Sequence, residues 1–154
     1  MNITLEKPQP WHVQFVADNM RQADRDEVAA TSDRDPVAAL WFSIEKSDAV
    51  WTVLFDGIPA AIFGVGVVSI ATGTAAPWML GTPAIMTHYV EFLKLSRNFR
   101  NQLLKQYSTL RNAVDARNAV AIRWLCWLGF SFYEHPLKHR GYEFRIFELR
   151  AGDV

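Results

Sequence analysis

The sequence has little of several features that mark specialised classes of protein. One cysteine, Cys126, occurs among 154 residues, so no internal disulfide can form, and we expect a buried, inert thiol in a reducing compartment. Lysine and arginine together number 16, as do aspartate and glutamate. The overall excess of positive charge typical of dedicated nucleic-acid-binding proteins is therefore missing, which argues against such a partner and leaves open a local basic patch. The longest apolar run, 58–71, is too short for a membrane helix, which predicts no membrane insertion.

The sequence also lacks the motifs of several enzyme classes. It has no glycine-rich dinucleotide fingerprint, no Walker loop and no nucleophile elbow. His135 and His139 stand on either side of a predicted turn with no third ligand near them in sequence, so we expect no metal site. Half of the residues are hydrophobic and 21% are charged, which is typical of one globular domain, here over 1–154.

The first half of the chain contains clear signals for two helices and a hairpin. Apolar spacing predicts a helix over 11–20, and Asp35 followed by Pro36 predicts the capped start of a helix that ends near Lys46. The polar segment 21–33 between them suits a loop or a short helical turn. Asp56-Gly57 lies between two apolar runs, 49–55 and the run from Ile58, which predicts a β-hairpin.

The second half alternates strands and helices. The pattern predicts a strand over 75–80, a long helix over 85–110, a strand over 111–115 and a helix over 118–128. A terminal hairpin follows, with strands 130–134 and 142–149 joined by the turn 138–141. This order predicts an α/β (α+β) fold with a mixed sheet of about six strands and helices on both faces.

The segment 118–130 carries a family resemblance. Its sequence, NAVAIRWLCWLGF, resembles the pattern Asn-x-x-Ala-x-x-Leu-Tyr-x-x-x-Gly-Phe of the GNAT superfamily of acyl-CoA-dependent N-acyltransferases. The resemblance covers most of the chain, most clearly from Ala75 onward. It implies a GNAT fold, and it implies acetyl-CoA as the cofactor if the protein is active.

The resemblance also implies where a cofactor would bind. The family's glycine-rich phosphate cradle, aligned on Leu103-Leu104, falls on 95–100, where Asn98 and Arg100 replace the glycines. The helical pattern continues upstream to Tyr89, which predicts that these amides are bonded within a helix and that the cradle is absent. Arg97 and Arg100 are therefore expected either to bind the cofactor phosphates by charge or to form a solvated helix face. Asn118 is expected either to contact the pantetheine arm or to cap its helix. The main chain of Trp78, Met79 and Leu80, continuing to Gly81, is expected to hold the thioester.

The acid and base of the reaction have no obvious residues. The family's usual tyrosine acid corresponds to Leu125, which has no hydroxyl group. Tyr133 and Tyr142 are candidate replacements, although aromatic strand residues also serve packing. Asp115 is a candidate base, and it is equally a turn residue before the helix.

One helix shows a second apolar stripe that suggests a partner surface. In 118–128 the stripe that contains Leu125 is expected to face the sheet, and Val120, Trp124 and Trp127 form another. Either the long helix or the terminal hairpin covers this second stripe, or it docks a second copy or a phage or host protein.

A closer resemblance concerns 99–129. This segment is similar to GNAT-like proteins of short-tailed phages, the internal virion protein A type, which also lack the glycine cradle. It implies a catalytically degenerate binding protein of a phage or prophage, located in the host cytoplasm or associated with the virion. The alternative is an active acetyl-CoA-dependent N-acetyltransferase that acts on an unknown amine.

Overall fold

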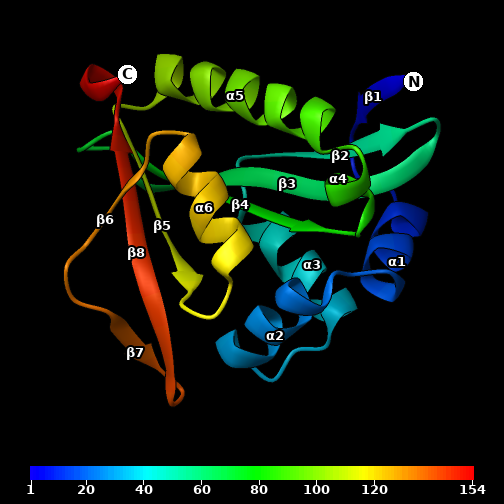
Figure 1. Cartoon of the computed structure of the whole chain (residues 1–154), viewed down its shortest axis with the longest axis horizontal. Coiled ribbons are helices and arrows are strands. Elements are labelled where there is room, and N and C mark those ends of the chain that lie inside the picture. Colours follow the sequence, from blue (N-terminus) through cyan, green and yellow to red (C-terminus); the bar gives the residue numbers. More distant parts are fainter. The chain divides into compact units, whose positions relative to one another are not determined.

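The computed structural model describes all 154 residues (Figure 1). The chain divides into two compact units. The first unit comprises Met1–Gly66 with Trp78–Tyr89, and the second comprises Val67–Pro77 with Val90–Val154. Strands β3 (Ile58–Ser69) and β4 (Thr74–Gly81) each run through both units. Neither unit is a continuous half of the sequence, which explains why no linker separates them.

The sheet of the first unit has the strand order β1-β2-β3-β4, with β1 (Ile3–Glu6) at its edge and β2 (Ala49–Phe55) next to it. The predicted hairpin between β2 and β3 is confirmed. Asp56 and Gly57 have φ angles of 51° and 79°, and this left-handed conformation matches the twist of a two-residue hairpin loop. Strand β1 was not predicted, because a four-residue edge strand is too short to show a period of two.

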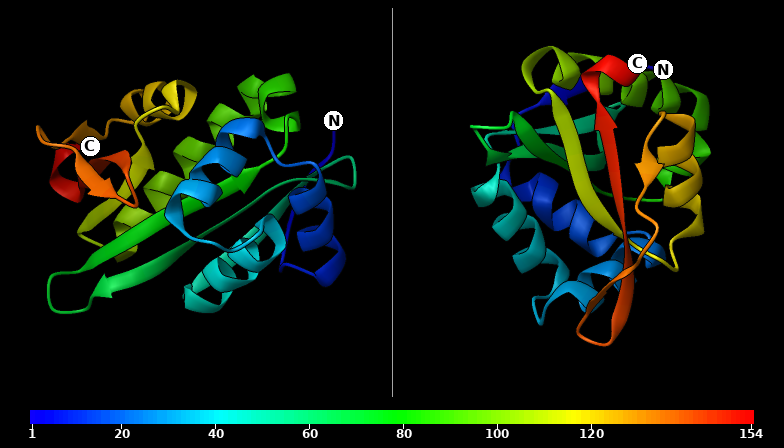
Figure 2. Two further views of the ribbon diagram at one scale, coloured as in Figure 1. Left: turned by 90° about the horizontal axis from the view of Figure 1, so that it is seen from below. Right: turned by 90° about the vertical axis from the view of Figure 1, so that its left-hand side faces the viewer.

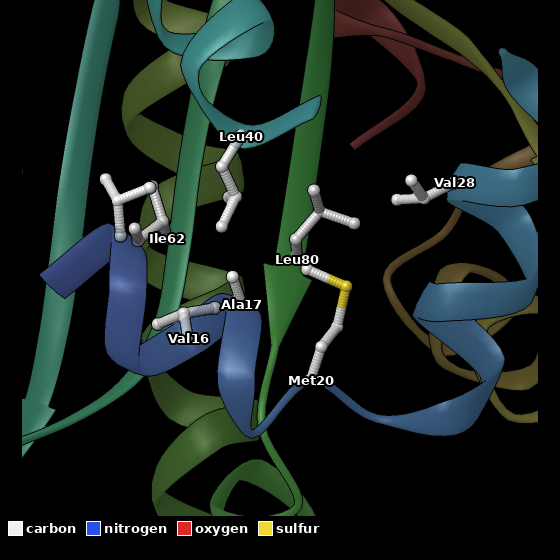
Figure 3. Close-up of a cluster of buried hydrophobic side chains, with 8 residues drawn as sticks. Val16, Ala17, Met20, Val28, Leu40, Ile62 and Leu80 are labelled. Carbon is white, nitrogen blue, oxygen red and sulfur yellow. The ribbon is translucent and has the colours of Figure 1, made fainter. Parts of the chain in front are cut away.

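Three helices bury the apolar side chains of the first unit (Figure 3). They are α1 (Pro10–Asp18), α2 (Gln22–Thr31) and α3 (Pro36–Lys46). The prediction of a loop or short turn for 21–33 is wrong, because ten of these residues form the complete helix α2. Its sequence shows little apolar periodicity, so packing of Val28 into the core stabilises it. The core cluster consists of Val13, Val16, Ala17, Met20, Val28, Leu40, Ile62 and Leu80.

The cap predicted for the third helix is confirmed. The Asp35 carboxylate accepts a hydrogen bond of 2.8 Å from the Ala38 backbone N–H, and Pro36 occupies the first helical position. This bond satisfies one of the backbone donors that a helix start leaves without an intrahelical partner.

Replacing Asp35 tests how much this cap stabilises the chain. We expect Asp35→Ala to lower the free energy of unfolding by about 1 kcal/mol, because the Ala38 N–H loses its acceptor. Asp35→Asn keeps an oxygen in place and is the matched control. Urea unfolding followed by circular dichroism measures both, and equal midpoints for the two variants would contradict this role.

The second unit has the strand order β4-β5-β8-β6, and β7 pairs with β8 (Figure 2, right). Parallel pairing joins β4 to β5 (Thr109–Asp115), and seven antiparallel pairs join β5 to β8 (Tyr142–Arg150). The predicted terminal hairpin differs in its first strand. Strand β7 (Leu137–His139) precedes the turn, whereas β6 (Ser131–Phe132) pairs with the far part of β8. The sheet strands therefore number eight rather than about six.

The predicted long helix 85–110 is two helices and part of a strand. A short helix, α4 (Ala84–Thr87), ends at His88, and α5 (Tyr89–Gln106) follows. Leu110 lies in β5, where it is buried. The helix predicted over 118–128 is confirmed as α6 (Ala119–Trp127), and η1 (Ala151–Asp153) ends the chain.

The structure also bears on the predicted burial of Cys126 and on the presence of helices that could span a membrane. The Cys126 thiol lies on an exposed residue of α6, so the expectation of a buried thiol is wrong. Leu125 and Leu128 occupy the buried side of that helix, which leaves Cys126 facing outward. Among the helices, none has both the length and the apolar character needed to cross a membrane.

Candidate functional site

In the second unit, the parallel ladder between β4 and β5 is short. It consists of two residue pairs, Thr74 with Thr109 and Ala75 with Leu110. On its other side, β5 stays paired with β8 as far as Asp115. One edge of β5 therefore continues beyond Leu110 without a β4 partner, and such an edge presents main-chain donors and acceptors.

Asn112 stands at the point where the ladder ends. Its side-chain amide donates a hydrogen bond of 2.9 Å to the Pro77 carbonyl of β4, and its amide oxygen accepts one of 2.8 Å from the Ala113 N–H. Pro77 itself has no N–H to donate. The Asn112 side chain thus takes the place of the next main-chain bonds between the two strands.

The end of β5 carries an ion pair with a buried carboxylate. Asp115 is 1% exposed, and both of its carboxylate oxygens accept hydrogen bonds from the Arg117 guanidinium, at 3.0 and 2.7 Å. These bonds hold the pKa of Asp115 below its usual range. The Arg117 guanidinium also lies 4.8 Å from the centre of the Tyr142 ring. Asp115 and Tyr142, two of the predicted catalytic residues, are therefore joined through Arg117, and the lowered pKa makes Asp115 a weak base.

The low pKa of Asp115 has a consequence for stability. An acid with a lowered folded-state pKa stabilises the fold above its unfolded pKa, and this contribution disappears as the pH falls through the folded value. We expect Asp115→Asn to unfold about 1–2 kcal/mol more easily than the parent at pH 7, because a hydrogen-bonded ion pair is lost. Thermal unfolding at pH 2–7 should show this difference shrinking below about pH 4. A constant difference would mean that the carboxylate charge does not matter.

Asn118 performs the helix-capping role that was one of its two predicted roles. Its side-chain oxygen accepts a hydrogen bond of 3.2 Å from the Ala121 N–H, and the residue is 6% exposed. The cap places the start of α6 directly after Asp115. A contact with a pantetheine arm stays a prediction.

In the first unit, a second buried carboxylate lies beside the end of β4, and it was not predicted from the sequence. Asp24 of α2 is 5% exposed and accepts a hydrogen bond of 3.0 Å from the Gly81 N–H. Arg21 lies 3.5 Å from the other oxygen, and its own backbone N–H donates to the Gly81 carbonyl at 2.9 Å. Burial raises the pKa of Asp24 against the opposing effects of Arg21 and Gly81. No local signal marks this residue, because its partner is 57 positions away.

The raised pKa of Asp24 predicts the opposite pH dependence to that of Asp115. An acid with a raised folded-state pKa stabilises the fold while it is protonated, and stability falls as the pH rises through the folded value. We therefore expect Asp24→Asn to gain stability relative to the parent as the pH rises from about 4 to 8. Asp26→Asn, on the same helix but exposed, is the control. Thermal unfolding across this range measures the difference in stability between Asp24→Asn and the parent. A difference that does not change with pH would refute the raised pKa.

The predicted thioester-holding residues Trp78, Met79 and Leu80 belong to the first unit. The Trp78 indole N–H donates a hydrogen bond of 2.7 Å to the Ser47 hydroxyl, and Leu80 points into the helical core. Both polar main-chain groups of Gly81 are bonded to the start of α2. The main chain available for a thioester is therefore restricted to 78–80.

The predicted loss of the phosphate cradle at 95–100 agrees with the structure, in which these amides lie within a helix. These residues lie inside α5, whose first residue is Tyr89, and Arg97 is about 12 Å along the helix from that residue. Segment 82–88, which contains α4 and no glycine, connects β4 to α5 instead. Arg97 lies over the Trp127 ring at 4.5 Å, and Arg100 donates to the Leu128 carbonyl at 2.5 Å. Binding of cofactor phosphates by these two arginines stays a prediction without a helix start to support it.

The remaining predicted site residues are placed as follows. Leu125 is buried, and the Tyr133 hydroxyl donates to Glu148 at 3.1 Å. In the apolar stripe, Val120 is half-buried and Trp124 packs on Phe92 of α5 with ring centres 5.3 Å apart. Trp127 stays 44% exposed. Helix α5 therefore covers much of the stripe, as one of the two predictions required.

The two units carry opposite charge. The first has five Lys and Arg against ten Asp and Glu, a formal charge of −5, and the second has eleven against six, a formal charge of +5. The net charge of zero is the sum of these two values. The net charge of the chain therefore does not reveal the electrostatic character of either unit.

Comparison with known proteins identifies the fold. A GNAT-family protein from Chromobacterium violaceum superposes with a TM-score of 0.69 at 15% identity, over 98% of this chain and 88% of that one. The chain has the GNAT fold. An aminoglycoside acetyltransferase crystallised with coenzyme A gives a TM-score of 0.69 at 13% identity, covering 97% of this chain and 95% of that one. The Escherichia coli ribosomal-protein-S18-alanine N-acetyltransferase gives 0.68 at 17%, over 97% and 94%.

The sequence matches no protein-family model and no curated protein. The predicted GNAT fold is thus confirmed by structure. The similarity to phage internal virion proteins receives no support from these comparisons and stays a prediction.

Proposed function

We propose that this protein is an acyl-CoA N-acyltransferase, with the β5 edge beyond Leu110 as the site for the cofactor's pantetheine arm. That arm contains two amide groups, which pair with a strand edge in the way an added peptide strand does. The termination of the β4–β5 ladder at Asn112 is the observation that carries the proposal, because it leaves this edge without a strand partner.

The charge of the second unit supports a phosphate-bearing cofactor. Coenzyme A carries several phosphate charges, which suit this unit with its formal charge of +5. Because no glycine cradle opens α5, the phosphates lack the close backbone contacts that such a cradle provides. We therefore expect binding in the range of tens to hundreds of micromolar.

Acetyl-CoA supplies an activated acyl group as a thioester, and the amine is the nucleophile. The main chain of 78–80 is the candidate for holding the thioester carbonyl. Asp24 is a better proton acceptor than Asp115, because burial raises the pKa of Asp24 while Arg117 lowers that of Asp115. The hydroxyl groups of Tyr142 and Tyr133 are candidates for protonating the departing thiolate.

A binding role without chemistry is the second candidate. The observation that favours it is the Trp127 side chain, which is 44% exposed on α6. In this role the protein acts in a phage particle or in a complex with a host protein, as the resemblance to phage proteins implies.

Titration of the intact chain with acetyl-CoA by calorimetry separates the two candidates. We expect binding with a Kd of tens to hundreds of micromolar, weakened in Asn112→Ala because the parting of the strands loses its support. Gln102→Ala, which also removes an exposed side-chain amide from α5, is the matched control and should bind like the parent. Absence of heat at millimolar acetyl-CoA would refute the enzyme and leave the binding role.

Transfer is then measured with a panel of polyamines, lysine peptides and aminoglycosides. Release of free CoA is followed with a thiol reagent, and Cys126→Ser removes the exposed thiol that would otherwise react with it. We expect Asp24→Asn to lower kcat about a hundredfold and to shift the pH profile. If Asp24→Asn leaves both the rate and the profile unchanged, Asp24 is not the base.

A further inference from the structure

The exposed face of α5 carries basic and amide side chains and no carboxylate after its first turn. From Glu91 to Asp115 the sequence contains five Lys and Arg residues and no acidic residue between them. Five exposed residues of α5 recur at spacings of three and four positions, so they share one side of the helix. These residues are Lys94, Arg97, Asn98, Asn101 and Lys105.

Helix α6 extends this face with an aromatic ring and another cation. The Arg97 guanidinium lies 4.5 Å from the centre of the Trp127 ring, which fixes the two helices side by side here. The indole remains 44% exposed. Arg123 is exposed and precedes Trp127 by four residues, so the two side chains are neighbours on the surface of α6.

The cations of this face have no acidic partner. The ion pairs of the second unit involve Arg111, Arg117 and Arg150. Lys94, Arg97, Lys105 and Arg123 take part in none of them. Burial and the nearby charge of Arg97 lower the pKa of Arg100, as expected where like charges are not compensated. A solvent-exposed protein surface usually carries both positive and negative side chains, whereas this face carries only positive ones.

We propose that this α5–α6 face, defined by Lys94, Arg97, Asn98, Asn101, Lys105, Arg123 and Trp127, binds single-stranded nucleic acid. Guanidinium, ammonium and amide groups are the side chains that contact phosphodiester backbones. An exposed indole beside them provides a platform on which a base stacks. Lys94 and Lys105 are about 16 Å apart along the helix, enough for several nucleotides.

A net charge of zero argues against a nucleic-acid partner for the chain as a whole and leaves a local basic patch open. The zero combines +5 on this unit with −5 on the other, so this unit has the basic character that the whole chain lacks. An acidic protein would also meet the cations. The exposed indole favours nucleic acid, because a base stacks on it and a carboxylate does not.

Fluorescence anisotropy of a labelled 20-nucleotide single-stranded DNA of mixed sequence, titrated with the intact chain, tests the proposal. We expect micromolar binding at 50 mM salt, because about three phosphates are neutralised. The affinity should fall about tenfold to twentyfold between 50 and 200 mM salt, in keeping with that number of contacts.

Two matched triple variants test whether the α5–α6 face, rather than the net charge of the whole chain, is responsible for binding. Lys94→Gln/Arg97→Gln/Lys105→Gln should lower the affinity at least tenfold and flatten the salt dependence. Lys7→Gln/Arg34→Gln/Lys46→Gln changes the net charge by the same amount in the first unit and should leave binding unchanged. Trp127→Leu, which keeps an apolar side chain, should weaken binding about tenfold through lost stacking. Circular dichroism checks that each variant is folded.

Three outcomes would overturn the proposal. They are absence of binding at 100 µM protein in 50 mM salt, equal losses in the two triple variants, or tighter binding of labelled polyglutamate than of the oligonucleotide. The last result would assign the face to an acidic protein. None of these measurements involves acetyl-CoA, so failure here leaves the proposed acyltransferase standing, and the converse also holds.

Discussion

The hydrogen bonds of the Asn112 side chain are the constraint on which the candidate site depends. A parallel pair of strands normally continues its ladder for as long as both strands run together. Here the ladder stops after Ala75 and Leu110, and a side chain rather than the main chain joins the strands at Pro77. Because the Ala113 N–H donates to that same side chain, this one donor stays paired at the point where the strands part.

Two buried carboxylates near strand ends show how neighbouring groups shift a pKa. Asp115 and Asp24 are almost equally hidden from solvent, yet their pKa values move in opposite directions. Asp115 receives several hydrogen bonds from Arg117, whereas Asp24 has a more distant arginine and one backbone N–H. At Asp115 the hydrogen bonds from Arg117 outweigh the effect of burial on the pKa, whereas at Asp24 burial outweighs Arg21 and the Gly81 N–H.

Turns and caps that depend on neighbouring residues were predicted correctly from the sequence. Features that depend on distant residues were not. The Asp56-Gly57 hairpin, the Asp35 cap and the Asn118 cap were all predicted from residues within three positions of their partners. Helix α2 was missed because its apolar periodicity is weak. The loss of the phosphate cradle at 95–100 was predicted from the helical pattern that continues upstream to Tyr89, which is the first residue of α5.

Turns, caps and apolar periods act over a few residues, so the order and type of most elements, and with them the GNAT fold, can be predicted from the sequence. Which charged groups lie together depends on the folded arrangement of distant segments. The bond from Gly81 to Asp24 joins residues 57 positions apart, and the bond from Asn112 to Pro77 joins residues 35 apart. The separation of a neutral chain into units of −5 and +5 likewise depends on how distant segments assemble. Electrostatic forces act through space, so their pattern appears only when the chain has folded.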